Sequence, residues 1–222
     1  MRVGTVTIGQ SPREDLIPEL SEVWGAGIEV LERGALDGLS RLAIEGMAPG
    51  PGDYALVTRL RDGSPVTIGK RHILPRVEEA VKELDQPGTG CILLLCTGTF
   101  PEFSTCAPLL KPDLLLHQAV PALAWGRRVG IMTPSPVQVQ QARDKWAGLL
   151  QDPVVTAANP YQEAERELKT AAMALEQAGA QIIVMDCMGY TQAMKRLVRS
   201  TSGLPVILAR SLVARLAAEL LG

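Results

Sequence analysis

Two cysteines stand at positions where a thiol could do acid/base chemistry. Cys96 follows the apolar run Cys91–Leu95, Cys187 follows Ile182–Asp186, and each has a glycine two residues later. A thiol at the end of a strand, just ahead of a helix, meets free backbone N–H groups and a positive helix dipole, which favour the thiolate. The same N–H groups could hold a carboxylate, since glycine lets the backbone approach a ligand closely. The pattern predicts two thiols beside anion-binding turns.

Purely structural roles have to be weighed against this chemistry, because cysteine is among the most buried residue types. Cys91 and Cys106 have no counterpart in the other half of the sequence, and we interpret both as structural. His72 and His117 lie outside the glycine-containing turns and are interpreted in the same way. The sequence has no CxxC pair and none of the GxSxG, GxGxxG or Walker A motifs. We therefore expect no metal site and no cofactor.

The two cysteines belong to what looks like an internal duplication. The run Val3–Thr7 resembles Val129–Thr133, and both runs lead to a Ser-Pro step. The run that ends at Cys96 likewise resembles the one that ends at Cys187. Because these features recur in the same order, the sequence predicts a duplicated α/β lobe.

The elements that must position these residues alternate between short apolar runs and helix-period segments, as in βαβ units. Strands are expected at residues 3–8, 27–31, 91–95, 129–133, 154–157, 182–186 and 205–208, with a hairpin at 54–60 and 66–69. Helices are expected after an N-cap at Ser11, over 74–84, after Thr99, from Pro136 to about Leu150, over 161–178, after Tyr190 and over 211–221. The fold class is therefore α/β.

Ligands of open α/β sheets collect beyond the carboxyl ends of the strands, where the repeated turns lie. We expect Cys96 and Cys187 to be catalytic and to face each other across one cleft. The expected substrate-binding residues lie in or beside the four turns: Ser11, Arg13, Thr97, Gly98, Thr99, Thr133, Ser135, Met188, Gly189 and Tyr190.

Composition narrows the classes of function. The 222 residues carry 22 Lys+Arg against 24 Asp+Glu, and aromatic residues make up 4%. A nucleic-acid-binding protein usually has a strongly basic face or stacking aromatics, so we expect no nucleic-acid partner. The sequence contains no run of about 18 apolar residues, so we expect no membrane-spanning helix. Met1–Gly4 leads directly into a strand-like run, without the apolar segment of a secretion signal. We therefore expect a cytoplasmic protein with no membrane partner.

Four segments resemble the AroM family: the opening Thr7–Arg13, the Asn159-Pro160 step, the run Asp186–Tyr190 and the C-terminal Ala214–Leu220. The layout is similar, more distantly, to the aspartate/glutamate/hydantoin racemase superfamily. That resemblance implies two pseudo-symmetric Rossmann-like lobes with mostly parallel sheets and one cysteine per lobe beside a small carboxylate. It implies that Cys96 and Cys187 take the places of the two catalytic cysteines.

The resemblance also bears on domain organisation. It implies that the C-terminal helix returns to the first lobe, which gives lobes of residues 1–116 plus 209–222 and of residues 117–208. It allows a homo-oligomer. Thr97 and Met188 stand where the superfamily usually has asparagine and threonine after the cysteines.

Residues 34–69 have no counterpart in the second copy. Insertions near a crevice are often lids, so this segment is predicted to shield the site. Arg59, Lys70 and Arg71 would then be further carboxylate contacts.

Two functions stay open at this point. The first is a cofactor-independent racemase or isomerase that acts at the carbon next to a carboxylate of a small acid by a two-cysteine acid/base mechanism, with related decarboxylase chemistry as a variant. The second is a non-catalytic protein of AroM type that binds a small carboxylate or an aromatic-pathway metabolite. The mirrored thiols favour the enzyme, because a pure binding protein needs neither.

Overall fold

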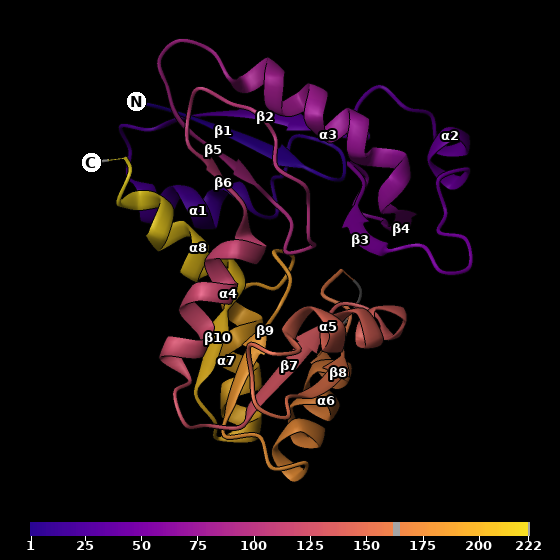
Figure 1. Ribbon diagram of the computed structural model, residues 1–222, viewed down its shortest axis with the longest axis vertical. Helices are drawn as coiled ribbons and strands as arrows, with labels where there is room; N and C mark the ends of the chain where they lie inside the picture. Colours follow the sequence, from indigo (N-terminus) through magenta and orange to yellow (C-terminus); the bar gives the residue numbers. More distant parts are fainter. Residues whose placement is uncertain (162–164, 222) are drawn as a thin grey trace. The chain divides into compact units, whose positions relative to one another are not determined.

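The computed structural model describes residues 1–161 and 165–221 (Figure 1). The chain divides into two compact units: Met1–Pro112 together with Val213–Gly222, and Asp113–Leu212. Each unit is built around one four-stranded parallel sheet.

The sheet of the first unit has the strand order β2-β1-β5-β6. Its strands are β1 (Arg2–Thr7), β2 (Glu29–Gly34), β5 (Thr89–Leu94) and β6 (Leu109–Leu110). Helix α1 (Ile17–Trp24) covers one face of the sheet and α3 (Lys70–Leu84) covers the other (Figure 1). Between β2 and α3 the chain forms α2 (Arg41–Glu45) and the antiparallel hairpin of β3 (Ala55–Arg59) and β4 (Pro65–Gly69).

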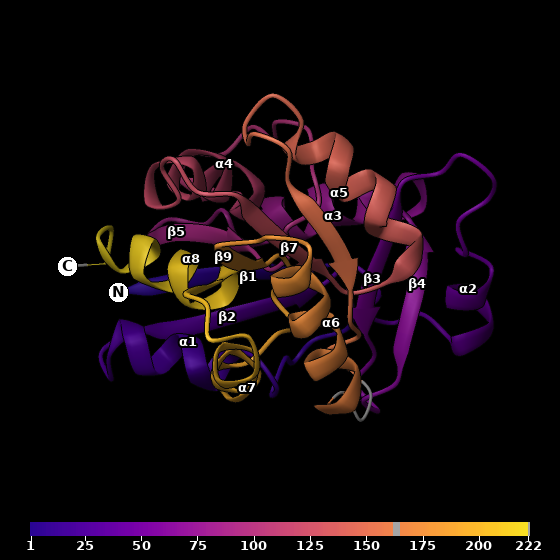
Figure 2. The same ribbon diagram turned by 90° about the horizontal axis from the view of Figure 1, so that it is seen from below.

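The sheet of the second unit has the strand order β10-β9-β7-β8. Its strands are β7 (Val129–Thr133), β8 (Val154–Ala157), β9 (Ile182–Met185) and β10 (Val206–Leu208). Its helices are α4 (Pro112–Leu123), the short 3-10 helix η1 (Pro136–Gln138), α5 (Val139–Trp146), α6 (Glu165–Gln177), α7 (Gln192–Ser202) and the start of α8 (Ala209–Ala218). Figure 2 shows α4 and α5 on one face of this sheet and α6 and α7 on the other.

The two sheets have the same topology. In each, the first strand in sequence lies inside the sheet, the second strand pairs on one side of it, the third on the other side, and the fourth pairs with the third. β1 thus corresponds to β7 and β5 to β9, the pairs of segments that resemble each other in sequence. The predicted fold class, α/β with two pseudo-symmetric Rossmann-like lobes and mostly parallel sheets, is confirmed.

Two predicted helix starts are wrong. Ser11 does not cap the first helix, which begins at Ile17, because the Ser11 side chain binds Asp37 instead. No helix follows Thr99: residues 95–108 are irregular, and Pro101 and Pro108 lack the N–H that a helix needs. The helix expected over residues 161–178 runs from Glu165 to Gln177, and residues 162–164 lie outside the described part of the chain.

The C-terminal helix α8 contributes to both units, since it begins at Ala209 in the second and ends at Ala218 in the first. In the first unit the Trp24 indole N–H donates to the Ala214 carbonyl at 3.0 Å, and Val213, Ala214 and Ala217 are fully buried.

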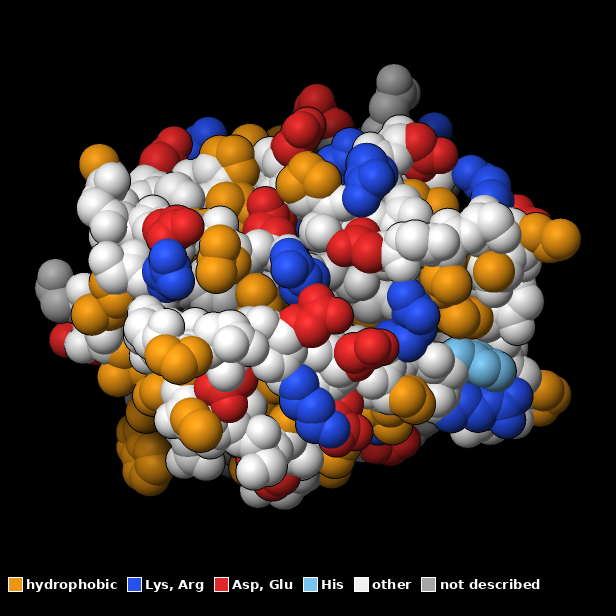
Figure 3. All heavy atoms as spheres, turned by 90° about the horizontal axis from the view of Figure 1, so that it is seen from above, with side chains coloured by type: hydrophobic (Ala, Val, Ile, Leu, Met, Phe, Trp, Pro, Cys, Tyr) orange, Lys and Arg blue, Asp and Glu red, His pale blue; other side chains and the backbone are white. Residues whose placement is uncertain are grey.

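Within residues 1–161 and 165–221, no helix combines the length and apolar character that crossing a membrane requires. Acidic and basic side chains are interspersed over the face in Figure 3.

Candidate active site

The two cysteines occupy equivalent places in the two sheets. In the first unit the Leu95 N–H donates to the Val6 carbonyl at 2.7 Å, and in the second the Asp186 N–H donates to the Met132 carbonyl at 2.9 Å. Each of these bonds links the third strand of the sheet to its first, and the next residue is Cys96 or Cys187. Both thiols therefore lie just past the carboxyl end of an interior strand, where open α/β sheets bind ligands.

Each thiol also has the same local hydrogen bond. The Gly98 N–H donates to Cys96 Sγ at 3.4 Å, and the Gly189 N–H donates to Cys187 Sγ at 3.3 Å. An N–H aimed at sulfur stabilises the thiolate more than the thiol. Because no helix directly follows Cys96, the donor there is the turn itself rather than a helix end. The two turns are thus built alike even though different residues follow the cysteines.

The insert of residues 34–69 borders the Cys96 turn within the first unit. A Cβ at position 98 would lie 2.6 Å from Leu56 Cδ2 of β3, so a larger residue there would have to displace the buried Leu56 side chain. The Lys70 ammonium donates to the Thr99 carbonyl at 3.2 Å, Arg59 lies 3.7 Å from Asp15, and Arg71 pairs with Asp53 at 3.2 Å. The hairpin packs beside Cys96 and Thr97. That the hairpin also covers a bound ligand stays a prediction.

Asp37, which follows β2, holds the loop after β1. Its carboxylate accepts the Ser11 hydroxyl at 2.5 Å and the Ser11 N–H at 2.8 Å. Arg61 of the hairpin turn donates its Nε to the Ser11 carbonyl at 2.8 Å. The structure therefore places Ser11 at the predicted edge of the sheet, with its hydroxyl engaged by Asp37.

Arg13 lies in the same loop but is buried. Its guanidinium donates to both Asp15 oxygens at 2.8 and 2.9 Å and to the Thr7 hydroxyl at 2.8 Å. The Glu32 carboxylate accepts the Arg13 N–H at 2.7 Å, and burial raises the pKa of Glu32 despite that bond. Arg13 thus supports the loop between β1 and α1, and its contact with substrate stays a prediction.

In the second unit the predicted residues again gather at one edge of the sheet. Thr133 is buried at the end of β7, and Ser135 precedes the short helix η1. Met188 and Gly189 form the Cys187 turn and are buried. Tyr190 is fully buried, donates its hydroxyl to the Ala158 carbonyl at 2.6 Å and has a pKa raised well above the usual range by burial. Its hydroxyl proton is donated to the backbone, and a contact of Tyr190 with substrate stays a prediction.

Asp186, directly before Cys187, belongs to a buried polar cluster. The Lys145 ammonium donates to both of its oxygens at 2.9 and 2.8 Å, and the Trp146 indole N–H donates at 2.9 Å. The His117 ring meets the Trp146 ring edge-on, with centroids 5.1 Å apart. Burial, and then the nearby Lys145 charge, lower the pKa of His117. These hydrogen bonds connect the end of β9 to α5 at the residue next to Cys187.

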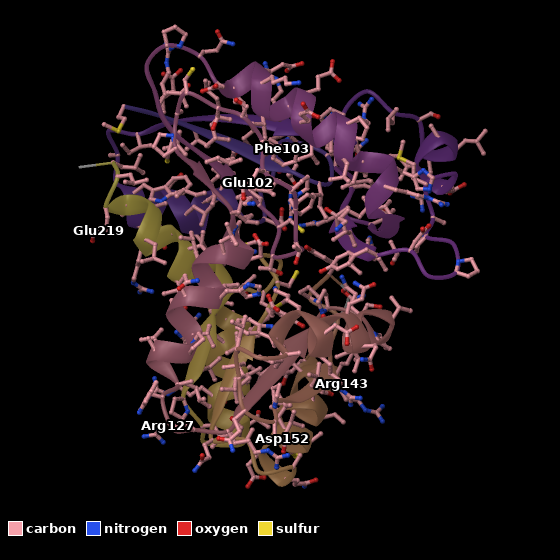
Figure 4. The ribbon with its side chains drawn as sticks, viewed as in Figure 1. Glu102, Phe103, Arg127, Arg143, Asp152 and Glu219 are labelled. Atoms are coloured by element: carbon pink, nitrogen blue, oxygen red, sulfur yellow. The ribbon has the colours of Figure 1, made fainter. Side chains whose placement is uncertain are left out.

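Two buried cations, which the sequence patterns did not reveal, hold the loops after the cysteines. Arg210 donates to the Met188 carbonyl at 2.9 Å and to the Gly189 carbonyl at 3.2 Å. In the first unit Lys111 donates to the Phe100 carbonyl at 3.3 Å and pairs with Glu102, labelled in Figure 4, at 2.6 Å. Each loop is thus held by a buried cation, and the charge of Lys111 is balanced by the Glu102 carboxylate.

The remaining cysteines provide internal references. Cys91 is fully buried in β5, and burial raises the pKa of its thiol to about 11. Cys106 is exposed. We expect Cys96 and Cys187 to react with iodoacetamide at pH 7 at least about tenfold faster than Cys91, because only thiolates react. Peptide mass spectrometry after timed alkylation measures this order, and equal rates for Cys91 and both candidates would contradict it.

Comparison with solved structures shows the same fold in several enzymes. Picrophilus torridus aspartate racemase is 14% identical and superposes with a TM-score of 0.58, over 98% of this chain and 94% of that one. An arylmalonate decarboxylase is 16% identical, with a TM-score of 0.59 over 100% and 93%. Nocardia farcinica maleate cis-trans isomerase is 15% identical, with a TM-score of 0.56 over 99% and 92%. At these identities the likeness establishes the fold.

Comparison at the level of sequence gives a more specific result. No match was found among curated proteins. The model of the AroM protein family matches residues 3–221, nearly the whole chain. The chain therefore belongs to the AroM family.

Proposed function

We propose that this protein is a cofactor-independent racemase or isomerase that moves a proton at the carbon next to the carboxylate of a small acid. Cys96 and Cys187 are its acid/base pair. The observation that carries the proposal is the equivalence of the two thiols: each lies at the same place in its sheet and accepts a backbone N–H two residues later. Duplication of the fold explains two similar sheets, but a protein that only binds has no use for thiols at two equivalent positions.

The mechanism requires the two thiols to face one carbon from opposite sides. Accordingly, the proposal assigns Cys96 to a lobe of residues 1–116 plus 209–222 and Cys187 to a lobe of residues 117–208. One thiolate takes the Cα proton, the C–H electron pair moves toward the carboxylate, and the other thiol delivers a proton to the opposite face. Backbone N–H groups and hydroxyls would stabilise the enolate-like intermediate. The groups assigned to this task are those of Thr97, Gly98, Thr99, Thr133, Ser135, Met188 and Gly189, with Ser11 and Arg13 holding the first loop in place.

The names of the similar structures support this class of reaction. Aspartate, arylmalonate and maleate are all small carboxylates, and the three proteins are named as a racemase, a decarboxylase and an isomerase. The buried Arg210 guanidinium fits an anionic substrate, because it places a positive charge beside the Cys187 turn, whose Met188 and Gly189 carbonyls it binds.

Solvent exchange tests the proposed function. The protein is incubated in heavy water with a panel of amino, hydroxy and aryl-substituted acids, and loss of the Cα proton signal is followed by NMR. We expect protein-dependent exchange with at least one acid and none with the Cys96→Ser/Cys187→Ser double variant. An acid that binds, as seen by a raised Tm, without any exchange would favour the binding protein instead.

A further inference from the structure

We propose that Tyr161 is a further catalytic residue: its phenol donates a hydrogen bond to the Cys187 sulfur and holds that sulfur as the thiolate. The assignment of Cys187 as an acid/base group rests on the function proposed above. The bond itself does not, because the Tyr161 hydroxyl lies 3.9 Å from Cys187 Sγ whatever the reaction is.

The loop that carries Tyr161 is fixed by several hydrogen bonds. It follows β8, and the Ala158 N–H donates to the Thr133 carbonyl at 2.9 Å. The Tyr161 N–H donates to Asn159 Oδ1 at 2.8 Å, and the Asn159 N–H donates to Glu167 of α6 at 3.1 Å. These hydrogen bonds fix the backbone position from which the Tyr161 side chain extends to the Cys187 turn.

Gly189 allows the phenol to reach the sulfur. A Cβ at this position would lie 2.5 Å from the Tyr161 hydroxyl oxygen, 2.6 Å from Cζ and 2.8 Å from Cε1. The ring thus packs against the same backbone whose N–H already donates to Cys187 Sγ. Glycine here serves two purposes: it supplies a donor to the sulfur and leaves room for a second one.

The direction of the bond follows from ordinary acidities. A tyrosine hydroxyl normally carries its proton at neutral pH, so it is the donor whenever the sulfur is ionised. With Gly189, the thiolate then has two donors, and each stabilises the charged form relative to the thiol. In the reaction the substrate Cα–H bond breaks and the S–H bond forms, while Tyr161 keeps its own proton throughout.

Tyr190 is the matched reference for this assignment. It lies three residues after the cysteine, but its hydroxyl donates to the Ala158 carbonyl at 2.6 Å. Removing the Tyr190 hydroxyl therefore deletes a phenol from the same region without deleting a donor to sulfur.

The test is the pH profile of Cys187 alkylation by iodoacetamide, read by peptide mass spectrometry between pH 6 and 10. Tyr161→Phe is expected to slow alkylation of Cys187 about tenfold at pH 7 and to move the midpoint up by about one pH unit. Gly189→Ala, which displaces the ring, is expected to move the midpoint the same way. Tyr190→Phe is expected to leave it in place, and the Cys96 profile is the internal check on folding.

An unchanged or lowered midpoint in Tyr161→Phe, with the Cys96 profile intact, would overturn the proposal. So would an equal rise in Tyr190→Phe. The measurement uses no substrate, so its failure leaves the proposed racemase activity standing. Conversely, if no acid exchanges its Cα proton but the midpoint rises as expected, the Tyr161 hydrogen bond is supported and the proposed reaction is wrong.

Discussion

Replacing either Cys96 or Cys187 with serine is expected to slow the interconversion of substrate enantiomers or isomers by about 10²- to 10⁴-fold. A serine hydroxyl is too weakly acidic to be ionised at neutral pH, so it cannot take over the work of a thiolate base. The change replaces the sulfur atom with oxygen and nearly preserves the size of the side chain. Each thiol serves one face of the carbon, so the loss of one suffices.

Cys106→Ser is the matched control for these variants, because Cys106 is exposed and has no place at a strand end. Its activity is expected to equal that of the wild type. Circular dichroism before the assay confirms that all three variants fold. Retention of more than about a tenth of the wild-type rate in either Cys96→Ser or Cys187→Ser would contradict the assigned roles.

Lys145→Met is expected to reduce the free energy of unfolding by about 3–5 kcal/mol. The Lys145 and Asp186 side chains are only 5% and 4% exposed, and they approach to 2.8 Å. Methionine preserves the length of the lysine stem but removes the ammonium that donates to both oxygens of the buried Asp186 carboxylate. Urea denaturation followed by tryptophan fluorescence measures the loss, with Trp146 in direct contact with the pair.

A second variant separates this charge effect from altered packing. Lys145→Met/Asp186→Asn removes both charges and keeps an oxygen acceptor for the Trp146 indole N–H. It is expected to recover most of the lost stability, because replacing both partners of a buried pair costs less than replacing one. A single variant within about 1 kcal/mol of the wild type would show that the pair does not hold β9 in place.

The duplicated lobes could be predicted from the sequence because the information is local. Short apolar runs that lead to a Ser-Pro step identify β1 and β7, and runs that stop at a glycine-containing turn identify β5 and β9, without knowledge of any partner strand. The turns with Cys96 and Cys187 could be found for the same reason. The common topology of the two sheets then follows from the repeated order of these elements.

Other features depend on residues far apart in the sequence. Ser11 suits an N-cap by type, but Asp37 lies 26 residues away and captures its hydroxyl. Arg210 holds carbonyls 21 and 22 residues earlier in the chain. Tyr161 reaches Cys187 across 26 residues. No hydrophobic period or sequence motif predicts such contacts. The buried cations and the phenol beside the thiol can therefore be identified only from the folded structure.

The most direct test of the two-thiol mechanism is the position of deuterium early in the reaction of one pure enantiomer in heavy water. The enantiomer is taken from the acids that exchange, and NMR and chiral chromatography are applied before about a tenth has been converted. Two opposed thiols predict that the product enantiomer carries deuterium at Cα while the recovered substrate still carries its original proton. Equal deuterium in both enantiomers would indicate one base serving both faces of the carbon, and would contradict the pairing of Cys96 with Cys187.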